Sequence, residues 1–278
     1  MKVKFLGTIA AEGGPALFCN CEACKEAMRR GGKDIRTRTQ ILVNEDMLID
    51  FPADSYLHKL KYNLDFSKVR YLLITHSHED HFYPHDLLLR GSYNGYNMVE
   101  PIMDIYCNQA VKDRFDGILN ENSNKEVLNG MKWNVVGEFE HIPTERYEIW
   151  TLKAKHMKTE NALFYLIKQG DKAFMQCNDT GLLYEEVYDF LSSLGVKIDV
   201  VALDSTMGAQ QKSYFGHMNV YECLETVERM RKSNFVKPTT RFVVTHFSHN
   251  GRLLQQEYED ICTPHGVEVA YDGKEMEF

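Results

Sequence analysis

Residues 75–81 read Thr-His-Ser-His-Glu-Asp-His, and this run constrains the fold more than any other part of the chain. It follows an apolar run, residues 69–74, which predicts a buried strand that ends just before the first histidine. One short loop therefore presents three imidazoles and a carboxylate: His76, His78, His81 and Asp80. Such groups are ligands for zinc, manganese or iron. The loop predicts part of a metal centre, and a solvated, histidine-rich strand end is the alternative.

The composition and the cysteine pattern predict a cytoplasmic protein with a substantial core. The 278 residues are 44% apolar and 12% aromatic, enough for a substantial core. A net charge of -8 argues against a general affinity for nucleic acid, but bound divalent ions can still attract a small anionic substrate. The apolar stretch at residues 1–7 is too short for a signal peptide, and no run is long enough to span a membrane. Seven cysteines, three clustered and four scattered, are typical of cytoplasmic thiols.

Strand-like and helix-like segments alternate along the chain, which predicts an α/β layered fold and one domain over residues 1–278. Two apolar stripes at helical spacing predict helices, one from about 220 with Asn219 and Glu222 as a capping pair, and one over about 183–194 closed by Gly195. Residues 267–274 predict a hairpin turning at Asp272-Gly273, and residues 91–143 predict an irregular insertion over the site. The predicted strands are residues 3–6, 39–43, 47–49, 69–74, 149–152, 162–167, 172–175, 198–203 and 241–245.

Three later strand ends carry further candidate ligands. His156 follows the strand at 149–152, Asp179 follows the strand at 172–175, and His246 ends the strand at 241–245. Rigid strand ends can hold ligands with the precision that a metal site needs. Each of these residues alone is also compatible with a hydrogen-bonded structural role.

A second cluster places Cys19, Cys21 and Cys24 within six residues. Three thiolates and one imidazole make a closed tetrahedral zinc site, which is structural rather than catalytic. His249 is the best candidate for the fourth ligand, and reactive or buried thiols are the alternative reading. The isolated cysteines are expected to be core thiols: Cys107, Cys177, Cys223 and Cys262.

The order of these residues resembles the metallo-β-lactamase superfamily, whose pattern is His-x-His-x-Asp-His followed by a His, an Asp and a final His. The resemblance implies a four-layer αββα sandwich with two metals between the sheet edges. It implies that one metal is held by His76, His78 and His156. It implies that the other is held by Asp80, His81 and His246, that Asp179 bridges the two, and that Asp80 also serves in catalysis. Asp50 would orient the site from behind the ligands, or would merely start the turn before Pro52.

The cysteine cluster narrows the resemblance to the phosphoribosyl 1,2-cyclic phosphate phosphodiesterases of the carbon–phosphorus lyase pathway. The matching stretches are residues 7–8, 14–16, 19–24, 179–180 and 245–249. In that family the cysteines and the last His of the final motif bind a structural zinc, and a His before a helix contacts the scissile phosphate. His217 stands in that place, although a plain loop histidine fits equally. Residues 91–143 and 9–12 depart from the family pattern.

The expected function is that of a two-metal phosphodiesterase, in which a metal-bridging hydroxide attacks a small phosphodiester, most simply a cyclic ribose or nucleotide phosphate. Two zinc or manganese ions and one structural zinc are the expected cofactors, and the oligomeric state is open, with a homodimer as one option. Three alternatives remain. They are a glyoxalase-II-like thioester hydrolase, a tRNA-processing-type nuclease, and a metal-bound carrier like the pyrroloquinoline-quinone-associated protein. A β-lactamase is disfavoured because the commonest zinc type carries a Cys where Asp179 stands.

Overall fold

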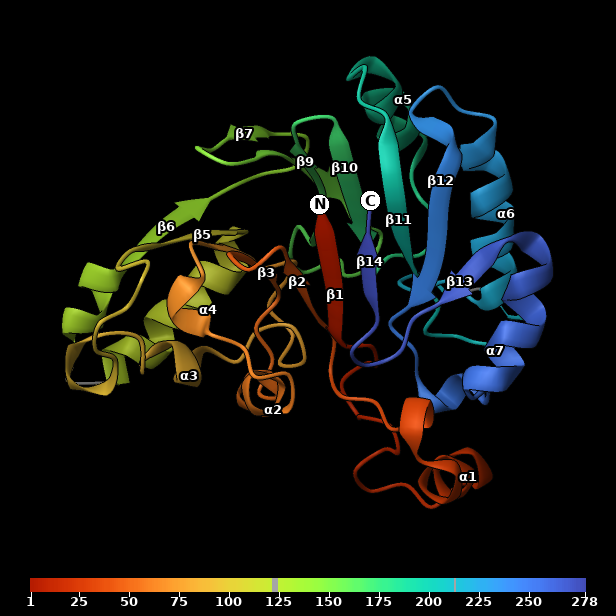
Figure 1. Cartoon of the computed structure of the whole chain (residues 1–278), viewed down its shortest axis with the longest axis horizontal. Coiled ribbons are helices and arrows are strands. Elements are labelled where there is room, and N and C mark those ends of the chain that lie inside the picture. The colour runs from red at the N-terminus through yellow and green to blue at the C-terminus, as the bar shows by residue number, and fades with distance from the viewer. Residues whose placement is uncertain (122–124, 213) are drawn as a thin grey trace.

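In the computed structural model, which describes residues 1–121, 125–212 and 214–278, two mixed β-sheets face each other and helices cover both outer faces (Figure 1). This confirms the layered α/β fold predicted from the sequence and the αββα sandwich that the resemblance implied. The first sheet has the strand order β14-β1-β2-β3-β4-β5-β6. Its strands are β14 (Glu275–Glu277), β1 (Lys2–Gly7), β2 (Gln40–Val43), β3 (Met47–Ile49), β4 (Tyr71–Leu73), β5 (Met103–Cys107) and β6 (Met131–Val135).

The second sheet has the order β13-β12-β11-β10-β9-β8-β7. In both sheets, one half is antiparallel and the other half is parallel, with β3 to β6 parallel in the first and β10 to β13 parallel in the second. The strands are β7 (His141–Pro143), β8 (Glu148–Lys153), β9 (Leu163–Gln169), β10 (Lys172–Cys177), β11 (Ile198–Asp204), β12 (Val236–Thr245) and β13 (Val267–Val269).

Helices α2, α3 and α4 flank the first sheet, whereas α5, α6 and α7 flank the second, and α1 lies apart near one end (Figure 1). The α-helices are α1 (Glu22–Arg30), α2 (Ser55–Lys61), α3 (Pro84–Leu87), α4 (Gln109–Glu121), α5 (Glu185–Ser193), α6 (Val220–Arg231) and α7 (Gln255–Cys262). The 3-10 helices are η1 (Gly32–Asp34), η2 (Phe66–Lys68), η3 (Ser92–Asn94), η4 (Lys125–Gly130), η5 (His249–Gly251) and η6 (Thr263–His265). The predicted capping pair at Asn219 and Glu222 is present at the start of α6.

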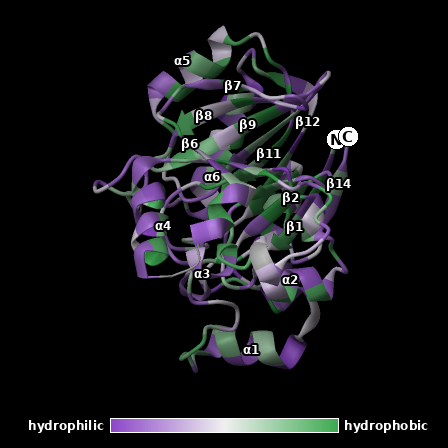
Figure 2. Ribbon diagram, turned by 90° about the vertical axis from the view of Figure 1, so that its left-hand side faces the viewer, coloured by the Kyte–Doolittle hydropathy of each residue, from purple (hydrophilic) through white to green (hydrophobic). Residues whose placement is uncertain are grey.

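The alternation of side chains along each strand divides the apolar residues between two clusters. Ile41 and Val43 of β2 face the core shared by the two sheets, whereas Leu42 between them faces the helices outside the first sheet. Successive strand residues point to opposite faces, so strands covered on both sides are apolar throughout. Figure 2 shows hydrophobic residues gathered along the strands and hydrophilic residues on the outer helices. The predicted core thiols at positions 107, 177, 223 and 262 are all buried.

Two expectations about the chain's organisation are wrong. Residues 91–143 are not an irregular insertion, because they supply β5, α4 and β6 to the layered fold. Positions 122–124 of this segment lie outside the described residues. The C-terminal hairpin does not form either. Asp272 and Gly273 do make a turn, but β13 pairs with β12 and β14 pairs with β1, so the turn carries the chain from one sheet to the other. Among the described helices, none is long and apolar enough to cross a membrane.

Candidate active site

The candidate ligands converge because six strands end at the same edge of the sandwich. In the first sheet, β3 and β4 run parallel and end at Asp50 and at the loop that begins with Thr75. In the second sheet, β8, β10, β11 and β12 share one direction. The loop is tied to the second sheet, since the backbone N–H of Leu163 donates to the Thr75 carbonyl over 2.9 Å. Side chains that are far apart in sequence therefore meet between the two sheets.

Three histidines form the first group of nitrogen atoms. His76 Nε2 lies 2.9 Å from His78 Nδ1, and His156 Nε2 lies 3.3 Å from the same atom. The Nδ1 atom of His156 faces the Gly216 carbonyl at 3.2 Å, which directs its Nε2 toward the other two rings. These are the residues that the resemblance assigned to one metal.

The second group combines a carboxylate with two imidazoles. His81 Nε2 lies 3.4 Å from Asp80 Oδ2 and 3.3 Å from His246 Nε2. All three residues are buried. These are the residues assigned to the other metal.

Asp179 lies between the two groups and presents one oxygen to each. Its Oδ1 is 3.6 Å from His156 Nε2, whereas its Oδ2 is 2.5 Å from His81 Nε2 and 2.9 Å from His246 Nε2. Oδ2 is fully buried, and these close nitrogens are not aligned to give it a satisfied hydrogen bond among the described residues. A buried carboxylate oxygen without such a bond is costly unless a cation takes the place of the donor.

Three residues of this edge hold a left-handed backbone: Asp50 (φ 67°), Asp179 (φ 50°) and His246 (φ 54°). This region is unfavourable for residues other than glycine, and such strain clusters at functional sites. Asp50 holds the loop from behind, because its Oδ1 accepts from the Thr75 N–H at 2.9 Å and its Oδ2 lies 2.7 Å from His81 Nδ1. The structure therefore places Asp50 where the sequence expected an orienting residue.

The sequence reasoning missed Asp204, the last residue of β11, which is fully buried behind the site. Its Oδ2 accepts from the Asp179 N–H at 3.0 Å and lies 3.1 Å from His217 Nδ1 and 3.2 Å from His246 Nδ1. The signal was available, since Asp204 follows an apolar strand just as Asp179 does. The strand predicted over residues 198–203 stops one residue short of this acid, because the apolar run ends at Leu203.

Four buried carboxylates make the site strongly favourable to positive charge. Burial alone would lower the pKa of His246, but Asp179 and Asp204 outweigh it and raise that pKa to about 10. Burial likewise opposes the raised pKa of His81, which Asp179, Asp50 and Asp80 cause. By contrast, His76 has few acidic neighbours, and burial keeps its pKa well below the usual value. The site attracts cations at the second group and offers neutral imidazoles at the first.

These donors fit divalent metal ions. At a zinc–nitrogen distance of about 2.0–2.1 Å, ligand atoms at the corners of a tetrahedron lie about 3.3 Å apart. Three nitrogen–nitrogen distances within the two groups, from His78 to His76 and to His156 and from His81 to His246, are 2.9, 3.3 and 3.3 Å. Imidazole and carboxylate are also the ligand types that such ions take. Together with the buried Asp179 Oδ2, this spacing shows that the residues are suited to two cations.

A cavity of about 400 Å³ opens over the two groups. His217 lines it and keeps its Nδ1 directed at Asp204, so Nε2 is the ring atom that can approach a bound oxyanion. Burial alone would lower the pKa of His217, but Asp204 outweighs it and raises that pKa. Other lining residues are Glu12, His78, Asp80, His156, Asp179, Tyr214 and His246.

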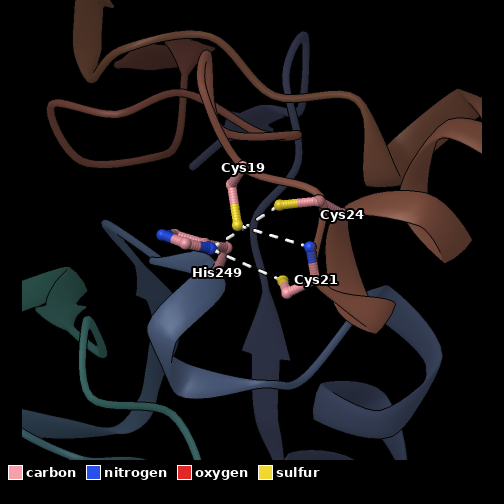
Figure 3. A group of neighbouring side chains, drawn as sticks. All are labelled: Cys19, Cys21, Cys24 and His249. Atoms are coloured by element: carbon pink, nitrogen blue, oxygen red, sulfur yellow. Dashed lines mark hydrogen bonds between the residues drawn. The ribbon is translucent and has the colours of Figure 1, made fainter.

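The four predicted structural-zinc residues also come together, at the junction of α1 and η5 (Figure 3). His249 Nδ1 lies 3.7 Å from Cys21 Sγ and 3.6 Å from Cys24 Sγ. A tetrahedron built with a zinc–sulfur distance of about 2.3 Å and a zinc–nitrogen distance of about 2.0–2.1 Å has a sulfur–nitrogen edge of about 3.6 Å. The pKa of Cys21 falls to about 6, because the His249 ring hydrogen-bonds its sulfur. The cluster is therefore a third group of metal-competent donors, separate from the two groups between the sheets.

Comparison with known proteins agrees with this geometry. The family model of the Beta-lactamase superfamily domain matches residues 46–247, which include every candidate ligand between the sheets. The chain belongs to this superfamily and has its metallo-β-lactamase fold. Residues 1–45, with the cysteine cluster, lie outside the matched range. A comparison with curated proteins finds no significant match.

Several solved structures share the fold over the whole chain. A diphosphatase from the PhnP family has a TM-score of 0.75 at 20% identity, covering 100% of this chain and 97% of that one. Zinc-bound PqqB from Methylobacterium extorquens has a TM-score of 0.75 at 16% identity and covers 100% of both. The short form of human tRNase Z has a TM-score of 0.65 at 16% identity, covering 100% and 99%. The family and the clustered donors together support a metal-dependent hydrolase.

Proposed function

We propose that this protein is a two-metal phosphodiesterase that acts on a small substrate. The observation that carries the proposal is the Asp179 carboxylate, whose two oxygens face two separate groups of ligands. One metal ion would be held by His76, His78 and His156, and the other would be held by Asp80, His81 and His246. Zinc or manganese suits both groups. Bound there, the two ions would lower the pKa of water and polarise the phosphoryl oxygens.

The chain's own residues would then orient the substrate and move protons. Asp204 holds the His217 ring by its Nδ1, so His217 can steady a phosphoryl oxygen or protonate the leaving alkoxide through Nε2. Asp50 keeps the His81 ring in place through Nδ1. The cavity of about 400 Å³ suits a small diester better than a folded nucleic acid, and the net charge of -8 supports the same choice.

The same proposal includes a structural zinc on Cys19, Cys21, Cys24 and His249. This zinc would join α1 to η5, which begins three residues after His246. It would therefore brace the end of β12, which His246 of the second group follows. The proposal also treats residues 1–278 as one domain in a reducing compartment. One core cluster draws on both sheets, and all seven cysteines are free thiols.

The test is turnover of bis(p-nitrophenyl) phosphate by the purified protein with added manganese or zinc, beside a glutathione thioester as the competing substrate. We expect diester hydrolysis that His78→Ala and Asp179→Asn abolish. His85→Ala is the matched control, because His85 is an exposed histidine on α3 outside the site. Hydrolysis of the thioester alone would favour a glyoxalase-like enzyme, and turnover of neither would favour a carrier.

A further inference from the structure

A tyrosine with a largely exposed ring stands at the mouth of the candidate active site. Tyr214 lines the cavity together with the candidate metal ligands, yet 57% of its surface is accessible to solvent. The next residue, Phe215, is 44% exposed. Single exposed rings are common on protein surfaces, but two adjacent ones at the mouth of a polar cavity are placed to contact a bound ligand.

The position of Tyr214 is fixed relative to the reacting groups. Its ring lies nearly parallel to that of His217, with 5.8 Å between centroids and an angle of 15°. The backbones of the two residues also form an antiparallel bridge. Tyr214 therefore has a fixed distance from the candidate acid rather than a free position on a loop.

Two glycines allow this segment to approach the site so closely. A Cβ atom at Gly181, two residues after Asp179, would lie 2.3 Å from the Phe215 carbonyl oxygen. A Cβ atom at Gly216 would lie 2.9 Å from His156 Nδ1. Residues 214–216 are thus packed against the turn that follows Asp179 and against His156, a candidate ligand of the first group. This packing holds Tyr214 in place beside the site.

The charges of the cavity limit what the rest of the substrate can carry. Apart from the candidate metal ligands, the acidic residue among the described lining residues is Glu12, and that lining includes no lysine or arginine. Lys155 and Lys158 instead lie over the Phe215 ring, with each Nζ atom 5.5 Å from its centroid. Metal ions bound between the sheets would hold one phosphodiester, and the described lining has no lysine or arginine for a second phosphate.

We infer that Tyr214 stacks on the base of a nucleoside cyclic phosphate, so that the natural substrate carries an aromatic group and no second phosphate. The inference rests on the proposed phosphodiesterase function and names its substrate class. Every nucleobase presents a flat π-face, and one stacked base changes binding by about 5- to 100-fold. The aromatic ring supplies that contact, while the cavity's charge disfavours a further anionic group.

The experiment compares kcat/KM for adenosine 2′,3′-cyclic phosphate with that for methyl riboside 2′,3′-cyclic phosphate, which has the same reacting group and no base. We expect the wild-type protein to prefer the adenosine substrate by about 5- to 100-fold. Tyr214→Leu should remove this preference, whereas Tyr214→Phe should keep it. Tyr96→Leu is the matched control, because Tyr96 is 74% exposed and lies outside the cavity lining.

The second part of the experiment tests whether the cavity disfavours a second phosphate on the substrate. Adding a 5′-phosphate to the adenosine substrate should lower kcat/KM, and Glu12→Gln should recover part of the loss. Hydrolysis of both riboside substrates without a preference, or a preference unchanged in Tyr214→Leu, overturns the inference and leaves the phosphodiesterase standing. A higher kcat/KM with the 5′-phosphate overturns the substrate class. Failure to hydrolyse any diester, bis(p-nitrophenyl) phosphate included, overturns the proposed function itself.

Discussion

Asp204→Asn should damage both the stability and the activity of this protein, although Asp204 is not a predicted ligand. The carboxylate is fully buried and divides its hydrogen bonds between two oxygens. Oδ1 accepts from the backbone N–H groups of Thr206 (3.0 Å) and Met218 (3.2 Å). Oδ2 accepts from the Asp179 N–H and faces His217 Nδ1. Every one of these donors requires an acceptor at position 204.

An asparagine amide has only one acceptor oxygen, so either orientation leaves donors facing its NH₂ group. If the NH₂ group replaces Oδ2, the Asp179 N–H and the His217 ring lose their acceptor. If it replaces Oδ1, two backbone N–H groups lose theirs. One buried donor without a partner costs about 1–3 kcal/mol, and we expect the free energy of unfolding to fall by at least that amount. Loss of an oriented proton donor should lower kcat by about 100-fold or more.

The assay is urea unfolding together with turnover of bis(p-nitrophenyl) phosphate and metal content of the purified variant. Asp199→Asn is the matched control, because Asp199 lies on the same strand and accepts from Ala173 N–H at 2.9 Å. It is five residues from Asp204, or about 16 Å along the strand. It should lose stability without losing activity. Activity of Asp204→Asn within about threefold of the wild type would refute the role of Asp204 in orienting His217, which requires about 100-fold.

Three further predictions concern the frame around the site. Gly181→Ala should lower diester turnover sharply with metal content retained, because its Cβ would meet the Phe215 carbonyl at 2.3 Å; unchanged kinetics would contradict the packing. Burial lowers the pKa of His58 from 6.5 to about 4, so stability is full above pH 6.5 and falls as the pH drops toward 4. Urea unfolding should show that the wild type loses about 1.6 kcal/mol more than His58→Gln between pH 6.5 and pH 5, and parallel curves would exclude this. Cys21→Ser should remove one metal per chain by elemental analysis while Cys262→Ser removes none; equal metal contents would dismiss the structural zinc.

The sequence predicted the parts of the fold in which local pattern and tertiary environment agree. Strands β3 and β4, and β2 after Gln40, are apolar at every position because both of their faces are covered, and this pattern predicts them as buried strands. Strand β5 was missed because it contains Asp104, which interrupts the apolar run and pairs with Arg70 at 3.2 Å. No local sequence pattern predicts an ion pair between two residues that are so far apart along the chain.

The C-terminal turn also shows that a local sequence pattern does not determine which strands pair. Asp272-Gly273 is a strong hairpin signal, since it favours a tight turn between two strands. The Asp272 carboxylate, however, accepts from Thr8 Oγ1 at 2.8 Å and from the Thr37 N–H at 2.7 Å. These distant partners hold the turn at the junction of the two sheets, so its flanking strands join different neighbours. A local signal fixed the turn, but long-range contacts decided which strands it connects.

By itself, the sequence determined the chemistry that the chain can carry. Three histidines and an aspartate after one strand, and a His or Asp after three others, are donors whatever their arrangement. Only the tertiary structure decided that these donors meet, because parallel strands of two facing sheets end at one edge. The same packing put Asp204 behind the site and Tyr214 at its mouth. The strand end makes Asp204 a candidate in the sequence, but its partners and the position of Tyr214 depend on neighbours that are distant along the chain.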